Sequence, residues 1–255
     1  MQEQLIRKVK LFGNGAHVSA PKEWLNEDIM IVRLSSPLDI KENIIKILKS
    51  YSEDILGIYL VGSYARSEQR EDSDIDVIAI TSKTNKRIKE GKYEIILISR
   101  ENLEKQLKNN ILPILPMLKE AKPLFNSQLI KDYKETKITK NNLSFHIETT
   151  KSALRIFQEA IRINEISENL IYSLVLRLRE VYIVDCLIKK QSFSNQDFSK
   201  IIKNLNSEKI YSLYQKDKKG IPLLKEKLNK EEFTNIADYI SKKLKEKEKW
   251  VKGKS

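Results

Sequence analysis

Apolar and polar positions alternate with a period of two in the first 35 residues. Two such runs flank a Gly-Asn-Gly turn signal at residues 13–15, and a third covers residues 29–34 after a short segment that begins with proline. This period is typical of β-strands. Because so short a piece cannot bury a core of its own, we expect this β module to dimerise or to pack on the rest of the chain.

Helical patterns and short apolar runs alternate in the middle of the chain. Apolar residues recur with helical spacing over residues 40–50, and apolar runs at 58–61, 75–80 and 93–98 predict three strands. The basic stretch 81–92 is interpreted as a turn. Prolines between residues 113 and 123 break up a helix that begins at Glu101, before a last short strand at 124–125. The pattern predicts a small mixed sheet with helices.

Beyond residue 140 the period is helical. Residues 145–166 and 168–189 predict two long amphipathic helices, and two or three shorter, lysine-rich helices follow, with an interruption at residues 219–222. We therefore predict an α+β chain in three parts. These are an N-terminal β module (residues 1–37), a mixed-sheet domain (38–135) and a C-terminal helical bundle (136–255).

Composition excludes several classes of protein. The 255 residues are 40% hydrophobic and 32% charged, which is typical of a globular chain and not of a disordered one. No apolar run is long enough to span a membrane and the N-terminus lacks a secretory signal, so we expect a cytoplasmic protein. The single cysteine, Cys186, excludes intrachain disulfides, and the two distant histidines, His17 and His146, argue against a histidine metal site.

The net charge of +12 is unevenly distributed along the sequence. Residues 1–37 and residues 38–135 each carry +1, whereas residues 136–255 carry +10. Net charge informs on partners and not on chemistry. We therefore expect an anionic acceptor or partner at the helical half. Arg177 and Arg179 lie two apart in an apolar helix and point to different faces, so at least one is expected to face the preceding domain.

The segment 57–70 has the pattern of a phosphate-binding turn. An apolar strand ends at Gly62, where the missing side chain lets a ligand approach the backbone. Ser63 opens a short helix, predicted to reach residue 70, whose free N–H groups and hydroxyl form an anion site. Arg66, one turn later, adds a bidentate phosphate donor. This segment is predicted to hold a polyphosphate.

Carboxylates follow on the next two predicted strands. Asp74 and Asp76 are separated by one residue, so on a strand both lie on the same face, about 7 Å apart. Neighbouring carboxylates repel unless a cation lies between them, and Mg²⁺ is a hard ion that takes carboxylate and phosphate oxygens. Glu94 starts the third strand, where a carboxylate is costly to bury unless it is paired or metal-bound. Each feature is common alone, but their combination is rare.

At these positions the sequence resembles the nucleotidyltransferase superfamily, and in particular its small, minimal nucleotidyltransferase branch. The segments G-S-Y-A-R at 62–66 and S-D-I-D-V at 73–77 match the motifs of that family, and the resemblance covers about residues 38–130. Ser67 departs from it, because the family often has glycine there. The resemblance implies that Asp74 and Asp76 bind two Mg²⁺ ions. Glu94 is the candidate third carboxylate, an assignment that the variable spacing of the third strand leaves open.

The same resemblance implies a reaction. Gly62, Ser63, Arg66 and Ser73 would bind an NTP, with ATP favoured. A nucleoside monophosphate would pass from it to an acceptor hydroxyl, with release of pyrophosphate, and Glu94 is also a candidate for the base that takes the hydroxyl proton. The acceptor stays open among a hydroxyl of a toxin-type protein, an RNA 3′ end and a small aminoglycoside-like molecule.

Two further resemblances concern the ends of the chain. Residues 1–37 resemble the AbrB-type swapped-hairpin family, which implies a homodimer and, in many members, DNA binding, although dimerisation alone is equally compatible with a local charge of +1. The helical half resembles, in pattern and order, the bundles of kanamycin nucleotidyltransferase and of HEPN-associated proteins, which implies a part in acceptor binding. The rival interpretation is a non-catalytic DNA-binding regulator that uses the N-terminal hairpin.

Overall fold

The computed structural model describes residues 7, 9–29, 37–70, 73–218 and 230–253. The chain forms two compact units, residues 1–42 and residues 43–255. None of the helices within the described ranges has the length and apolarity that a membrane span requires.

The first unit contains the hairpin that the alternating pattern predicts. Strands β1 (Lys10–Phe12) and β2 (Gly15–His17) pair antiparallel around the turn at residues 13 and 14, and a 3-10 helix, Lys22–Trp24, follows. Every residue of the two strands is exposed. Most of the predicted third strand, residues 29–34, lies outside the described residues. Helix α1 (Pro37–Ile47) begins at the end of this unit.

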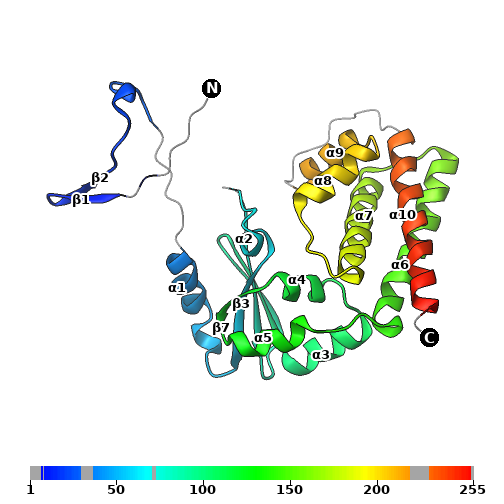
Figure 1. Cartoon of the computed structure of the whole chain (residues 1–255), viewed down its shortest axis with the longest axis horizontal. Helices are drawn as coiled ribbons and strands as arrows, with labels where there is room; N and C mark the ends of the chain where they lie inside the picture. The colour runs from blue at the N-terminus through cyan, green and yellow to red at the C-terminus, as the bar shows by residue number, and fades with distance from the viewer. Residues whose placement is uncertain (1–6, 8, 30–36, 71–72, 219–229, 254–255) are drawn as a thin grey trace. The chain divides into compact units, whose positions relative to one another are not determined.

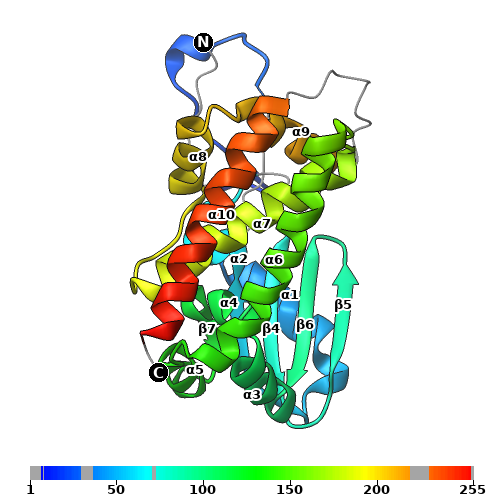
Figure 2. The same cartoon turned by 90° about the vertical axis from the view of Figure 1, so that its right-hand side faces the viewer.

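The second unit begins with a five-stranded mixed sheet. Its strand order is β5-β6-β4-β3-β7, with β4 and β6 parallel and the other neighbours antiparallel. Figure 1 labels β3 and β7 of this sheet, and Figure 2 labels β7, β4, β6 and β5. The predicted runs at 58–61, 75–80, 93–98 and 124–125 are confirmed as strands, each slightly longer than expected. The strands are β3 (Ile55–Val61), β4 (Ile75–Thr81), β5 (Lys86–Glu90), β6 (Tyr93–Ser99) and β7 (Lys122–Phe125).

Strand β5 corrects the interpretation of residues 81–92 as a turn. It forms the edge of the sheet, and four of its five residues are exposed. Charged side chains are a common protection of an edge strand against pairing with other chains. Because only Ile88 is apolar in this strand, the alternation that marks a half-buried strand is missing from the sequence.

Short helices lie between the strands and after the last of them. They are α2 (Gly62–Arg66), α3 (Arg100–Asn109), α4 (Ile114–Glu120) and α5 (Ser127–Lys134). The helix predicted from Ser63 to residue 70 is wrong at its end, because it stops at Arg66, and Ser67 takes the left-handed conformation with φ +60°. Of the prolines expected to break helical structure, Pro116 lies within α4.

The rest of the second unit is helical, as predicted. The helices are α6 (Lys140–Ile163), α7 (Glu168–Ile188), α8 (Asn195–Asn204), α9 (Glu208–Lys218) and α10 (Lys230–Lys252). Helix α6 starts five residues before the expected position, at a capping box formed by Thr139 and Asn142. Helix α10 spans 23 residues, so the expectation of only short helices there is wrong. It lies beside α6 (Figure 2).

One continuous core joins the sheet to the helices. It runs from Tyr59 and Ile78 in the sheet, through Leu107 in α3, to Leu178 in α7 and Phe233 in α10. The buried side chain of Asn142 donates to the carbonyl oxygens of Leu107 and Lys137, over 3.1 and 3.0 Å. The domain boundary between residues 135 and 136 stays a prediction.

Candidate active site

Gly62 lies where β3 meets α2, against the side chain of Asp76. Its φ is +69°, and a Cβ atom at this position would lie 2.2 Å from Oδ2 of Asp76. The cause is the sheet register, in which Val61 of β3 pairs with Asp76 of β4. Glycine is required here for two reasons: the backbone has a positive φ, and there is no room for a Cβ atom beside Asp76. The first and second predicted motifs therefore lie in contact.

The three predicted carboxylates lie at the same end of β4 and β6. Asp76 pairs with Glu94 in the parallel register of these strands, so both side chains emerge on one face. Asp74 directly precedes β4. Asp74 is exposed, whereas Asp76 and Glu94 are half-buried. The sequence prediction that Glu94 lies beside the aspartate pair thus agrees with the strand register, and its role stays a prediction.

Lys89 in β5 supplies a positive charge at this cluster. Its Nζ lies 2.5 Å from Oε1 of Glu94, and this hydrogen bond, with the charge of Asp74, raises the pKa of Lys89. Carboxylate oxygens are the donors that a hard cation such as Mg²⁺ prefers. Within the described ranges, no three His, Cys, Asp or Glu side chains converge tightly enough to hold a metal ion. The residue types fit Mg²⁺, but Glu94 is paired with Lys89 and would have to leave this contact to become a ligand.

The other predicted nucleotide ligands have different surroundings. Ser63 is the second residue of α2 and is half-buried. Ser73 closes a local turn, because its Oγ accepts a hydrogen bond of 2.8 Å from the backbone N–H of Arg70. Arg66, at the end of α2, donates from Nε to Glu68 over 2.8 Å. A phosphate bound by Arg66 would compete with this carboxylate.

Glu120, the last residue of α4, is a site residue that the sequence analysis missed. Its Oε1 accepts the backbone N–H of Gly62 over 2.6 Å, and its Oε2 accepts Nη1 of Arg66 over 2.5 Å. Burial raises the pKa of Glu120, while Arg66 lowers it. One sequence signal exists: an acidic residue at a helix C-terminus opposes the helix dipole and needs another partner.

A cavity of about 400 Å³ extends from Arg66 and Glu120 to helices α6 and α7. It brings residues from both predicted domains together, and Arg177 and Arg179 both line it, as expected for at least one of them. Its lining residues are Arg66, Asn110, Leu112, Pro113, Pro116, Met117, Glu120, Phe145, His146, Thr149, Arg177, Arg179, Glu180, Ile183 and Phe193.

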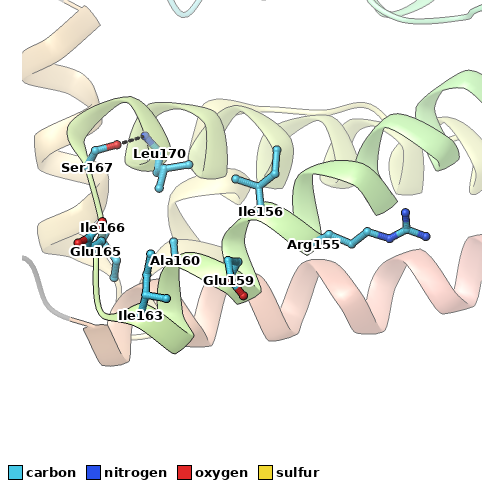
Figure 3. A pocket seen from close by; sticks show the side chains of 9 residues that line it. All are labelled: Arg155, Ile156, Glu159, Ala160, Ile163, Glu165, Ile166, Ser167 and Leu170. Atoms are coloured by element: carbon cyan, nitrogen blue, oxygen red, sulfur yellow. Dashed lines mark hydrogen bonds between the residues drawn. The ribbon is translucent and has the colours of Figure 1, made fainter.

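A second hollow, of about 670 Å³, lies at the turn between α6 and α7 (Figure 3). The apolar residues Ile156, Ala160, Ile163, Ile166 and Leu170 form much of its lining. None of the predicted site residues lines it, so it does not belong to the candidate active site.

Comparisons with known proteins identify a family for part of the chain. Residues 41–153 match the family model of the nucleotidyltransferase domain. No curated protein matches the chain. Among solved structures, a nucleotidyltransferase-like protein from Exiguobacterium sibiricum is 14% identical over 82% of this chain and 75% of that one, with a TM-score of 0.38. A spectinomycin adenyltransferase from Enterococcus faecialis, solved with ATP and spectinomycin, is 15% identical over 81% of this chain and 98% of that one, with a TM-score of 0.41.

The matched segment contains the Gly62 turn, the paired aspartates and Glu94. It also contains all five strands of the sheet. Residues 41–153 therefore form a nucleotidyltransferase domain, and the chain is a transferase enzyme.

Proposed function

We propose that this protein transfers a nucleoside monophosphate from an NTP, with ATP favoured, to an acceptor hydroxyl in a reaction that depends on Mg²⁺. The observation that carries the proposal is the contact between the Gly62 turn and Asp76, next to Glu94 on the neighbouring strand. In-line transfer requires that the phosphate-binding turn and the carboxylate pair lie close enough together to act on the same nucleotide.

In this reaction the acceptor oxygen forms a bond to the α-phosphorus. The bond between the α-phosphorus and the bridging oxygen of the β-phosphate breaks, and pyrophosphate leaves with the electron pair. Ser63 and the N–H groups at the start of α2 orient the phosphates, with Arg66 and Ser73 as further candidates. The proton of the acceptor passes to Glu94 in our proposal.

Asp74, Asp76 and Glu94 are the residues that would hold Mg²⁺. When bound, one or two such ions would neutralise the negative charge on the attacking and leaving oxygens. Because Asp76 lies against Gly62, these carboxylates would hold such an ion next to the phosphate turn.

Release of pyrophosphate tests the proposal. The protein is incubated with Mg²⁺, each of the four NTPs and an extract of its own source as the supply of acceptor. We expect Asp74→Ala and Asp76→Ala each to reduce release by about 100-fold or more, since charge stabilisation at a reacting phosphate is lost. Asp132→Ala is the matched control, because Asp132 is an exposed aspartate in α5. Activity that survives either change at the site contradicts the mechanism.

The helical half is proposed to bind the acceptor. The excess of +10 in residues 136–255 favours an anionic acceptor, such as RNA or an acidic surface of a toxin-type protein. Labelling with α-³²P-NTP in the same extract distinguishes protein, RNA and small-molecule products. A cytoplasmic location follows from the same proposal, since NTPs and Mg²⁺ are abundant there.

A further inference from the structure

The carboxylate of Glu120 joins the two ends of helix α2. Its Oε1 accepts the backbone N–H of Gly62, the first residue of α2, over 2.6 Å. Its Oε2 accepts Nη1 of Arg66, the last residue of α2, over 2.5 Å. Because the N–H group of Gly62 holds one oxygen, the direction of the other oxygen toward Arg66 is fixed. Glu120 therefore sets the position of the guanidinium group.

This ion pair is shielded from water. The side chains of Arg66 and Glu120 are only 15% and 10% exposed. Exposed ion pairs contribute little to stability, whereas a buried charge that loses its partner is costly. Any ligand that drew Arg66 away from Glu120 would leave such a charge behind.

The neighbouring Arg179 does not replace Arg66 as the partner of Glu120. Burial raises the pKa of Glu120, and among the charges that oppose this effect Arg66 acts more strongly than Arg179. Nη2 of Arg179 donates to Oδ1 of Asn195 over 3.1 Å, and no ion pair joins Arg179 to Glu120 within the described ranges. Glu120 therefore depends on Arg66.

The second carboxylate on Arg66 belongs to Glu68, which has other contacts. Nε of Arg66 donates to Oε2 of Glu68 over 2.8 Å, and the side chain of Glu68 is 23% exposed. Oε1 of Glu68 accepts the backbone N–H of Asn195 over 3.1 Å. If Arg66 bound another anion in place of Glu68, this carboxylate would keep the N–H group of Asn195 and its contact with water.

These contacts favour one edge of the guanidinium for a ligand. Phosphate binds arginine best through two adjacent N–H groups on one edge. Nη2 belongs to both such edges, and it has no hydrogen-bond partner among the residues that the structure describes. A phosphate on Nη1 and Nη2 would displace the shielded Glu120, whereas a phosphate on Nε and Nη2 would displace only Glu68. The second edge costs less to occupy.

We propose that Glu120 is a positioning residue that holds Arg66 by Nη1 and leaves Nε and Nη2 for a phosphate of the NTP, while Glu68 gives way. The inference rests on the proposed function, in which Arg66 is a candidate phosphate ligand. Glu120 itself neither touches the nucleotide nor transfers a proton. Its role requires two acceptor oxygens, one for Gly62 and one for Arg66, and glutamine supplies only one.

Calorimetry on the full chain tests this role, with Mg²⁺ and whichever of the four NTPs the wild type binds most tightly. In Glu120→Gln the side chain keeps an oxygen for the N–H group of Gly62 and turns its NH₂ group toward Arg66. We expect NTP binding to weaken by about tenfold or more, since a hydrogen bond between charged groups is lost. Glu135→Gln is the matched control, because Glu135 is an exposed glutamate directly after α5, and it should bind as the wild type does.

A double-mutant cycle with Arg66 separates positioning from a general effect on the fold. Arg66→Ala should also weaken NTP binding by about tenfold or more. Adding Glu120→Gln to Arg66→Ala should then change the affinity by less than about twofold, because the residue through which Glu120 acts is gone. An equal further loss in the Arg66→Ala background would show that Glu120 acts through the fold, and it would overturn the proposal.

Glu68→Gln gives a second test with the opposite sign. This side chain keeps an oxygen for the N–H group of Asn195 and loses only its attraction for Arg66. Because Glu68 competes with the phosphate for Nε, we expect NTP binding to tighten by about twofold or more. Unchanged or weaker binding by Glu68→Gln overturns the proposal, and this result decides the matter if Glu120→Gln does not fold.

Failure of this inference differs from failure of the proposed function. If the wild type binds an NTP and releases pyrophosphate, and Glu120→Gln binds the NTP as tightly, the positioning role is wrong and the proposed function stands. If the wild type neither binds any NTP nor releases pyrophosphate in the extract, the proposed function fails, and the role of Glu120 fails with it.

Discussion

At the scale of single residues, Gly62 is the most constrained position of the site. Gly62 and Gly91 both have positive φ, +69° and +56°, but a Cβ at Gly91 would meet nothing within 4 Å, whereas at Gly62 it would meet Asp76. Alanine substitutions at these two glycines therefore separate the cost of a positive φ from the cost of a steric clash with Asp76.

We expect Gly91→Ala to lower the free energy of unfolding by about 1 to 2 kcal/mol, which is the cost of the left-handed conformation. Gly62→Ala should cost more, and it should also abolish most nucleotidyl transfer, because Asp76 must move away. Urea unfolding and pyrophosphate release measure the two effects. Equal stability and activity of the two variants would show that the contact with Asp76 has no consequence.

His146 gives the folded protein a specific dependence on pH. Burial, together with the charges of Lys247 and Arg177, lowers its pKa to about 3, and the charge of Asp185 acts in the opposite direction. In the unfolded chain a histidine titrates near 6.5. Below that pH the unfolded state binds a proton that the folded state does not bind, so the stabilisation present above pH 6.5 is lost as the pH falls towards 3.

Between pH 6.5 and pH 5 this loss should be about 1.6 kcal/mol, because the slope rises from about half of 1.4 kcal/mol per pH unit at pH 6.5 to nearly the full value at pH 5. His146→Phe should remove it, so the variant should lose less stability than the wild type over this interval in urea unfolding. His17→Phe should follow the wild type, because His17 is exposed. Parallel pH curves for all three proteins would mean that His146 is protonated in the folded state.

The residues of the site differ in how far the sequence could reveal them. Gly62, Asp74 and Asp76 lie within 15 positions of one another, and local strand geometry is enough to place them together. Glu120 and His146 could not be found in this way, because only tertiary packing brings them to the site. An isolated glutamate or histidine in a helix carries no periodic signal of its own.

At the scale of elements, Ser67 explains why helix α2 is so short. It closes the helix in the left-handed conformation, with φ +60°, and its backbone N–H bonds to the carbonyl oxygens of Ser63 and Tyr64. Glycine is the usual residue at such a helix end. The departure from the family motif at this position is therefore a source of strain and not a loss of a ligand.

Ser67→Gly should stabilise the protein by up to about 1 kcal/mol, since the strain of the left-handed conformation is removed. Asn164→Gly is the matched control at the end of α6, where φ is also +60°. Asparagine tolerates this conformation better than serine does, so its replacement should have a smaller effect. Thermal unfolding measures both. A destabilised Ser67→Gly protein would show that the hydrogen bond from Lys122 to the serine hydroxyl outweighs the strain.

The elements found from the sequence are those with apolar faces. Strands β3, β4 and β6 are buried at most positions, so continuous apolar runs mark them. Strand β5 is held by backbone pairing at the sheet edge, and its charged side chains resemble those of a loop. Helix α10 was expected to be short because lysine-rich sequence conceals its apolar side, which includes Phe233, Ile240 and Val251.

At the scale of the whole molecule, the first unit exposes apolar side chains that need a partner. Leu11 is 84% exposed and Phe12 is 72% exposed, both in strand β1. A two-stranded sheet is marginal on its own in water. The predicted homodimer would cover these side chains with a second copy of the same unit.

We expect the full chain to sediment as a dimer, and the double variant Leu11→Ser with Phe12→Ser to sediment as a monomer. Lys10→Ser, in the same strand, is the control and should stay dimeric. A monomeric wild type would contradict the prediction. Loss of a gel shift on DNA in the double variant, with nucleotidyl transfer unchanged, would instead favour a DNA-binding role for this unit.

The continuous core has a consequence for how proteins of this kind can diversify. Helix α6 shares apolar contacts with α3, and the side chain of Asn142 is anchored on the carbonyl oxygen of Leu107. Recombination that joined this sheet to a foreign helical half would leave these surfaces mismatched and the carbonyl without its donor. New specificities in proteins of this kind should therefore arise by point substitution more readily than by exchange of whole domains.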